Sequence, residues 1–264
     1  FLSEYENGRT PNPCVLCNPT IKFGELLDKS VDLGAEFMAT GHYVQLKEIN
    51  SLIHIFRPKD KKKDQTYMLW DLSQEQFAKV KFPLADYTKD EIRKITSKFD
   101  LQTSIQKDSQ EICFIKDSYT EYIRDKIEYK KGDVILENYG KIGEHKGLPF
   151  YTIGQRKGLG ISWESPIYIK KLDTKKNQII VTDKKENLTE SVFYIKNTNW
   201  INEPKNKELE VQIRYNSKPV IVKSITESTD KYKVELHEKA MSITPGQSAV
   251  FYSDDELIGG GIIE

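Results

Sequence analysis

The sequence predicts an α/β region followed by regions built mainly from β-strands. The chain has 264 residues, which is more than one hydrophobic core usually organises. Helical and strand-like patterns alternate over the first part of the chain, as they do in α/β layers with a parallel sheet. Short β-type runs between turns dominate afterwards. We therefore expect three domains, at residues 1–117, 118–200 and 201–264.

The α/β part begins with a helix. IKFGELLDKSV, residues 21–31, places apolar side chains at 23, 26, 27 and 31, the spacing of one helix face. A short buried strand in GAEFMATGHYV follows and leads into a Gly-containing turn. Residues 64–80 carry a second helical pattern, and Thr88 with Glu91 forms a capping box that starts a third. The charge-dense stretch RPKDKKKD, residues 57–64, predicts a solvated loop.

The remaining elements are strands. Residues 132–161 are glycine-rich with short β-type runs, and PIYIKKLDTKKNQIIVTD, residues 166–183, predicts a hairpin. From about residue 205, β-branched and polar residues alternate between turns at intervals of roughly 8 to 12, as in small all-β barrels. The third domain is therefore predicted to be a β barrel.

Composition excludes some classes of protein. Basic and acidic residues number 40 each, so no global field indicates a nucleic-acid partner, which would have to be met by local patches. No run of about 18 apolar residues and no secretion signal occurs, so we expect a cytoplasmic protein without a membrane partner. In a reducing compartment, a CxxC pair is more often redox-active or metal-binding than a structural disulfide.

The chain contains three cysteines. Cys14 and Cys17 lie in GRTPNPCVLCN, where Arg9, Lys22 and a following helix favour a reactive thiolate at Cys17. The alternative is that both are small buried apolar residues, although the neighbouring prolines favour an exposed loop. Cys113 lies in QKDSQEICFI, where a polar loop leads into an apolar β-like segment, and by itself it reads as a core residue.

Several strings together resemble the bacterial tRNA-specific 2-thiouridylase family, MnmA or TrmU. They are GRTPNPCVLCN, IKF, ATGHYV, KDQTYMLW, KDSQEICFI, YTIGQRKGLG, PGQSAVFY and GGGII, and they span essentially the whole chain in order. The resemblance implies the C-terminal part of an adenine-nucleotide-hydrolase-like (PP-loop) domain, a small central domain and a C-terminal β barrel. The family's Ser-Gly-Gly-x-Asp-Ser loop for ATP would lie upstream of Phe1, so we expect that the chain as written does not activate ATP alone.

The resemblance also implies a reaction. The family uses ATP with Mg²⁺ to adenylate the C2 oxygen of the wobble uridine in tRNAs for Lys, Glu and Gln, and then replaces that oxygen with sulfur. By similarity, Cys113 carries a persulfide supplied by a cysteine desulfurase or a sulfur relay protein. Cys17 then frees the sulfide or closes a disulfide with Cys113. Splitting one hard displacement into two easier steps is the purpose of such activation.

Cys14 departs from the family, many members of which have Asp at this position. The acid–base role of this position is therefore in doubt. Thiolates of Cys14, Cys17 and Cys113 could instead hold an iron–sulfur cluster with one open iron. A closed zinc site is disfavoured because no fourth ligand is evident.

Other positions match family contacts one by one. The resemblance implies an ATP contact at Gly41 and tRNA contacts, mainly with the anticodon loop, at Asn12, Pro13, Cys14, His42, Lys63, Asp64, Gln65, Arg214, Tyr215 and Gln247. GQRKGLG, residues 154–160, predicts a secondary phosphate contact through Arg156, although a solvated β turn explains the string equally well. The rival hypotheses are a non-catalytic tRNA-binding fragment and a redox or iron–sulfur protein.

Overall fold

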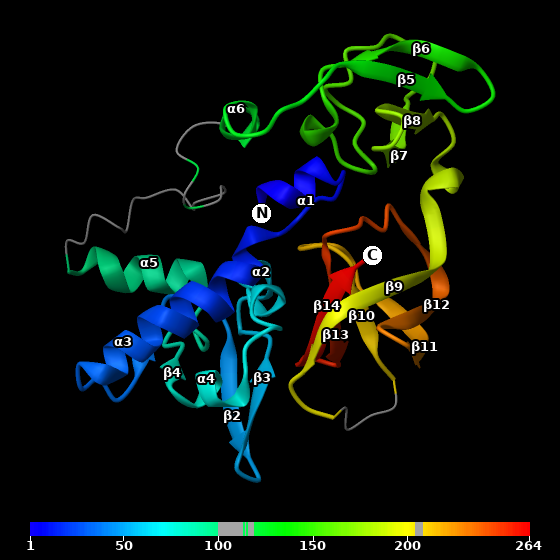
Figure 1. The fold of residues 1–264 in the computed structure, drawn as a ribbon. Helices are drawn as coiled ribbons and strands as arrows, with labels where there is room; N and C mark the ends of the chain where they lie inside the picture. The colour runs from blue at the N-terminus through cyan, green and yellow to red at the C-terminus, as the bar shows by residue number, and fades with distance from the viewer. Residues whose placement is uncertain (100–112, 114, 116–118, 204–207) are drawn as a thin grey trace.

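The computed structural model describes residues 1–99, 113, 115, 119–203 and 208–264. Figure 1 shows an α/β region, a small central sheet at one end, and a C-terminal β region beside the α/β region. The short helix α1, Leu2–Glu6, lies between the central sheet and the rest of the molecule. The predicted loop before Cys113 and the predicted domain boundary at 117/118 fall outside the described residues.

The α/β region begins with a nearly continuous helical segment. It consists of α2 (Pro13–Cys17), a π-helical stretch (Asn18–Glu25) and α3 (Leu26–Asp32). The helix predicted from the 21–31 pattern is confirmed, and it starts earlier because Pro13 and Asn12 provide a helix start upstream. A kink occurs at Gly24, whose φ of −98° and ψ of −106° are not helical.

The rest of this region is a short parallel sheet and two helices. The strands are β1 (Met38–Ala39) and β4 (Val80–Lys81), and the helices are α4 (Gln74–Ala78) and α5 (Lys89–Ser97). β1 and β4 pair in parallel, as predicted. The capping box at Thr88 and Glu91 is confirmed at the start of α5. Between residues 64 and 80 only α4 is α-helical, because a 3-10 turn at Thr66–Met68 and its capping contacts interrupt the pattern.

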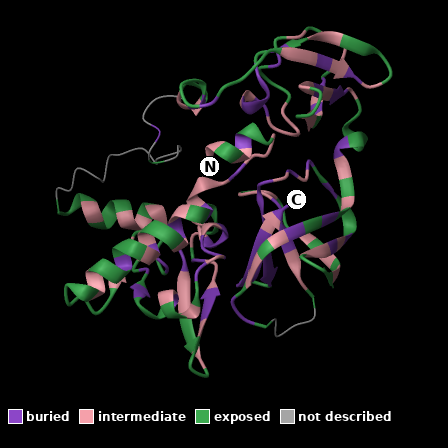
Figure 2. Cartoon of the chain, viewed as in Figure 1, coloured by how far each residue is buried: buried purple, intermediate pink, exposed green. Residues whose placement is uncertain are grey.

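A hairpin connects the α/β region to the C-terminal sheet. β2 (Gln45–Ile49) and β3 (Leu52–Phe56) pair antiparallel, and β3 also pairs with β14 (Glu256–Ile263). The two regions therefore share one sheet. They also share one hydrophobic core, to which Tyr67 and Trp70 contribute from one side and Tyr252 from the other. Figure 2 shows buried residues running through both regions.

The central region is a four-stranded sheet in the order β6-β5-β8-β7. Its elements are α6 (Tyr119–Arg124), β5 (Gly132–Leu136), β6 (Gly140–His145), β7 (Tyr168–Asp173) and β8 (Gln178–Thr182). β7 and β8 form the predicted antiparallel hairpin. The inward side chains of β5, β7 and β8 make a separate small core.

The C-terminal strands form a ring of pairings. They are β9 (Thr189–Trp200), β10 (Glu210–Gln212), β11 (Val220–Ser228), β12 (Lys231–Met241), β13 (Ser248–Ser253) and β14. The order runs β13-β10-β11-β12-β9-β14, and β13 also pairs with β14. The structure differs from the predicted domain boundary at 200/201, because β9 pairs with β12 and β14 and buries Phe193 and Ile195 in this region's core.

The GGGII string has a packing explanation. A Cβ at Gly260 would lie 2.6 Å from the Trp70 ring, and one at Gly259 would lie 2.3 Å from the Asn199 carbonyl oxygen. Only glycine allows this approach. Along the stretches that the model describes, no helix is long and apolar enough to cross a membrane.

Candidate active site

The CxxC pair lies on α2, at the start of the long helical segment. Asn12 is its N-cap, and its side-chain oxygen accepts a hydrogen bond from the Cys14 backbone N–H at 3.2 Å. Pro13 occupies the first helical position, where a missing N–H costs nothing. Asn12 and Pro13 therefore set the start of the helix and with it the positions of both cysteines.

This segment is anchored by hydrogen bonds to the 66–68 turn and to α4. Asn12 Nδ2 lies 3.3 Å from Met68 Sδ, and the buried Asn18 donates from Nδ2 to the Met68 carbonyl at 2.8 Å. Gln76 of α4 donates to the Pro19 carbonyl at 2.9 Å. Contacts on both sides of the cysteines therefore hold α2 against the rest of the α/β region.

The three thiols occupy different environments. Cys14 and Cys17 are half-buried and Cys113 is exposed, and all three are free thiols. Reading Cys113 as a core residue is thus wrong, because its side chain faces solvent. The pKa of Cys14 is raised, first by burial and then by the negative charges of Cys113 and Cys17, while Lys22 acts in the opposite direction. Cys113 therefore lies within electrostatic reach of the CxxC segment, although 96 positions separate it from Cys17 in the sequence.

The described residues show no ready-made site for a single metal ion. Within the described ranges, no group of three His, Cys, Asp or Glu side chains is placed to hold one. The iron–sulfur cluster on Cys14, Cys17 and Cys113 stays a prediction that this arrangement does not support.

A pocket of about 480 Å³ adjoins the helical segment. Its lining residues come from that segment, from β1, from the loop after β1 and from the residue before the 66–68 turn, and they are Lys22, Leu26, Met38, Ala39, Thr40, Gly41, His42 and Gln65. The loop at Thr40–His42 follows the carboxyl end of a parallel strand, which is where ligands of open α/β sheets usually bind.

His42 is a neutral hydrogen-bonding residue in this pocket. Burial, reinforced by the Lys22 charge, lowers its pKa from 6.5 to about 4. Its Nδ1 lies 2.7 Å from Thr40 Oγ1 and its Nε2 lies 3.5 Å from Lys22 Nζ. Since ammonium can only donate, Nε2 accepts from Lys22 and Nδ1–H donates to Thr40.

Gly41 has no packing reason to be glycine. A Cβ there would meet Leu84 Cδ1 at 3.7 Å, an ordinary van der Waals distance, and its φ is not positive. The residue is exposed at the pocket. The missing side chain thus leaves room on the pocket side, which fits a nucleotide lying against the backbone.

Lys22 contacts both parts of the site. It lines the pocket, reaches His42, and its charge acts on the Cys14 thiol. Sequence reasoning considered Lys22 only as a cation near Cys17. Its position beside His42 depends on the π-helical stretch, which no sequence pattern indicated.

Three family models match the chain in order. They are a tRNA methyl transferase HUP domain over residues 1–117, a tRNA methyl transferase PRC-barrel domain over 120–183 and an aminomethyltransferase beta-barrel domain over 190–263. The tRNA-specific 2-thiouridylase MnmA of Carboxydothermus hydrogenoformans is 41% identical over 273 residues, covering 100% of this chain and 74% of its own length. MnmA 1 of Clostridium tetani is 43% identical over 270 residues, with 100% and 74% covered. MnmA 2 of Clostridium botulinum strain Hall is 43% identical, with 100% and 76% covered.

The chain belongs to the MnmA family of tRNA-specific 2-thiouridylases. As the family name states, its members are transferases that thiolate tRNA. The matched ranges also agree with the strand pairing, because the PRC-barrel match ends at residue 183 and the beta-barrel match begins at 190, next to the start of β9.

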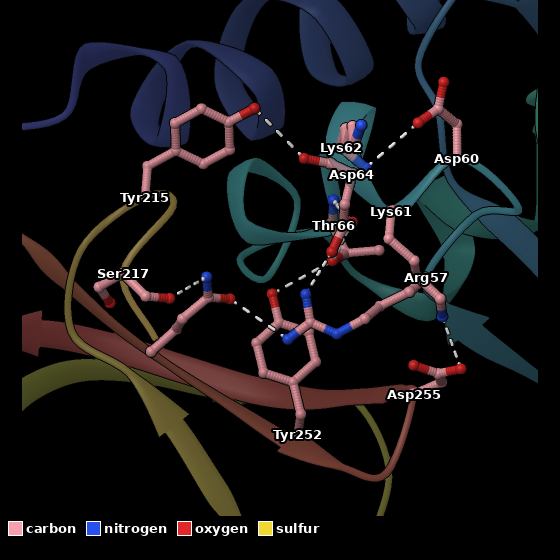
Figure 3. A network of polar contacts seen from close by, with 11 residues as sticks. Arg57, Asp60, Lys61, Lys62, Asp64, Thr66, Tyr215, Ser217, Tyr252 and Asp255 are labelled. Atoms are coloured by element: carbon pink, nitrogen blue, oxygen red, sulfur yellow. Dashed lines mark hydrogen bonds and ion pairs between the residues drawn. The ribbon is translucent and has the colours of Figure 1, made fainter. Parts of the chain in front are cut away.

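In this MnmA-family chain, the segment predicted as a solvated loop at 57–64 is partly buried. Arg57 and Asp64 form an ion pair with side chains only 15% and 10% exposed. Asp64 also accepts hydrogen bonds from Thr66 N at 2.9 Å and from Thr66 Oγ1 at 2.7 Å, as Figure 3 shows. Arg57 lies over the Tyr252 ring at 3.8 Å, so the segment joins the α/β region to the C-terminal sheet.

Gln65 and Lys63, the two residues next to Asp64 in the chain, have other surroundings. Gln65 lines the pocket, and its side-chain oxygen accepts from Tyr43 N at 2.9 Å. Lys63 is the last residue of a 3-10 turn, Lys61–Lys63, which comes just before Asp64 and its hydrogen bonds. The structure thus brings Gln65 to the pocket together with Gly41 and His42, and it places Asp64 in an internal network.

Arg214, Tyr215 and Gln247 lie at joints between regions. Arg214 donates to the Ile153 carbonyl of the central region at 3.4 Å and to Thr244 Oγ1 at 2.7 Å. Tyr215 donates from its hydroxyl to the Asp64 carbonyl at 3.2 Å. The buried Gln247 donates from Nε2 to the Thr10 carbonyl at 2.6 Å, just upstream of the CxxC segment. The sequence alone could not reveal these internal partners.

Proposed function

We propose that this protein is the ATP-dependent enzyme that replaces the C2 oxygen of the tRNA wobble uridine with sulfur. The observation that carries the proposal is that Lys22 lines the pocket after β1, lies beside His42 and reaches the Cys14 thiol with its charge. A nucleotide-sized pocket and a sulfur carrier must meet at one uridine in this reaction, and the structure supports such a meeting point. Thiolation of tRNA further implies a cytoplasmic location.

The residues have distinct proposed roles. Gly41 and the neutral His42 accommodate the adenylate, and Lys22 offsets the negative charge that develops when the C2 oxygen leaves as AMP. The described lining includes no carboxylate, so Mg²⁺ would arrive on the ATP phosphates, its usual manner of binding in such sites. Cys113, which is exposed, receives the persulfide sulfur from a donor protein, and Cys17 assists its release.

The tRNA would approach the same face. His42 and Gln65 line the pocket, and Asn12, Pro13 and Cys14 form the start of α2. All five are proposed contacts of the target base and its neighbours. Proposed contacts of the anticodon arm are Lys63, Asp64, Arg214, Tyr215 and Gln247. They would act through the polar atoms that their internal hydrogen bonds leave accessible. A contribution of Arg156 is favoured by its exposure on the glycine-rich loop.

The test is a thiolation assay with the full-length protein, ATP, tRNA and a persulfide donor, with 2-thiouridine measured by nucleoside mass spectrometry. Cys113→Ala should abolish product, whereas Asp255→Ala, which alters an exposed ion pair with Lys61, should not. Thiolation that survives Cys113→Ala would remove the persulfide role from this residue. Tight tRNA binding without any thiolation by the wild type would favour the non-catalytic alternative.

A further inference from the structure

Cys14 is a thiol that the proposed sulfur transfer does not use. It lies on α2 three residues before Cys17, and both side chains are half-buried. Residues three apart on a helix have Cβ atoms about 5–6 Å apart. A disulfide needs a Cβ separation of about 3.5–4.5 Å, so a small adjustment of the first turn of α2 brings Cys14 and Cys17 into bonding geometry.

Cys14 is also the thiol of the pair whose pKa responds to Cys113. The charge of Cys113 is the largest influence on the Cys14 pKa after burial, and it precedes that of Cys17. Cys14 therefore has both other thiols within electrostatic reach. An exchange onto Cys17 requires contact only between Cys14 and Cys17, which lie three residues apart on α2.

We propose that Cys14 is the resolving thiol of the cycle, freeing Cys113 from a disulfide with Cys17 by forming a Cys14–Cys17 disulfide. This inference rests on the proposed function. It deepens that function by assigning a chemical role to the position where many relatives carry Asp.

The exchange balances in atoms and electrons. The Cys17 thiolate attacks the inner sulfur of the Cys113 persulfide; a Cys17–Cys113 bond forms and the outer sulfur leaves as hydrosulfide, which is delivered to the uridine. The Cys14 thiolate then attacks the Cys17 sulfur; the Cys14–Cys17 bond forms, the Cys17–Cys113 bond breaks and Cys113 leaves as thiolate. A dithiol reductant finally returns Cys14 and Cys17 to thiols and is itself oxidised to a disulfide.

The electrostatics favour this order of events. Burial raises the pKa of Cys14 throughout, and the charges of Cys113 and Cys17 raise it further while those two sulfurs are thiolates. Once those two sulfurs are joined in a disulfide, both charges disappear. The Lys22 charge, which favours the thiolate, then acts without them. Cys14 therefore becomes a better nucleophile at the step that requires it.

The first test needs neither ATP nor tRNA. The full-length protein is treated with one equivalent of inorganic polysulfide, quenched in acid, alkylated and mapped by mass spectrometry without reduction. Wild type should end with a Cys14–Cys17 linkage and Cys14→Ser with a Cys17–Cys113 linkage. Cys113→Ser is the control for direct oxidation and should give little Cys14–Cys17 linkage.

Two results of this mapping would overturn the proposal. One is wild type that retains the Cys17–Cys113 linkage, and the other is Cys113→Ser that forms the Cys14–Cys17 linkage as fast as wild type. Neither result depends on thiolation activity. A wild type inactive on tRNA would contradict the proposed function but leave this mapping informative.

The second test measures which thiol is free after the persulfide has been discharged without added reductant. A maleimide reagent should label Cys113 in wild type, because the remaining disulfide joins Cys14 and Cys17, and should leave Cys113 of Cys14→Ser unlabelled. Dithiothreitol should restore the labelling of Cys113 in the variant. A wild type in which Cys113 stays unlabelled until dithiothreitol is added would count against the resolving role.

Discussion

Asp64 offers a quantitative test of whether the 57–64 segment is an internal joint. Its side chain is 10% exposed, pairs with Arg57 and accepts two hydrogen bonds from Thr66. Asp64→Ala removes all of these and leaves the Arg57 guanidinium, itself 15% exposed, without its carboxylate. Removing one partner of a buried pair costs about 3–5 kcal/mol, and the residual exposure here favours the lower end, about 3 kcal/mol.

The matched control is Asp255→Ala, which removes the same group from an exposed pair with Lys61, where the side chains are 51% and 60% exposed. Such surface pairs contribute about 0–1 kcal/mol. In chains of this size 1 kcal/mol corresponds to roughly 2–4 °C in Tm, so Asp64→Ala should lower Tm by about 6–12 °C and the control by less than about 4 °C. Differential scanning fluorimetry and urea titration measure both. If Asp64→Ala is as stable as its control, Asp64 is not part of an internal joint, and weaker tRNA binding by that variant would leave only the proposed RNA contact.

Two further predictions concern the pocket. Gly41→Ala should leave the free energy of unfolding unchanged or raise it slightly, within about 0.5 kcal/mol, because the added Cβ has room and φ is not positive. The same variant should bind ATP about tenfold more weakly, which is about 1.4 kcal/mol. Unchanged ATP affinity in calorimetry would show that the nucleotide does not approach this backbone. The folded-state pKa of His42, about 4, lies below its ordinary 6.5, so the unfolded chain binds the proton more readily and the His42 contribution to stability is lost as pH falls from 6.5 toward 4. His42→Gln should flatten that part of the stability–pH curve, and curves for wild type and variant that run parallel across this window would contradict the buried neutral histidine.

Local signals predicted local structure well. The Thr88–Glu91 capping box and the β7–β8 hairpin are confirmed because each depends on residues close together in the chain. β9 was assigned to the wrong side of a domain boundary because its membership is decided by pairing with β12 and β14, which lie 30 or more residues away. The charge-dense string RPKDKKKD predicted a solvated loop because the partners of Arg57, the Tyr252 ring and the Asp64 carboxylate, are set by the folded chain.

In the candidate site too, features set by neighbouring residues differ from features that only the folded chain decides. The sequence predicted a helix after the CxxC segment and an exposed loop at its prolines, whereas Asn12 and Pro13 start the helix before both cysteines. That Cys113 faces solvent near this helix could not follow from its own apolar surroundings, and only the family resemblance linked it to Cys17. Neither the backbone nor the packing requires glycine at Gly41, and the structure therefore leaves room for the nucleotide contact proposed there.

The segment that precedes the cysteines connects all three regions. Thr10 receives a hydrogen bond from Gln247 and donates its N–H to the Pro245 carbonyl, and its hydroxyl contacts Thr152 of the central region at 3.2 Å. Two residues later Asn12 caps α2 and contacts Met68. The thiols are therefore positioned by the C-terminal and central regions as well as by the α/β region. Because the C-terminal region and the α/β region also share one core and one sheet, a substitution at the Thr10–Gln247 contact should disturb the start of α2 as well as the C-terminal region.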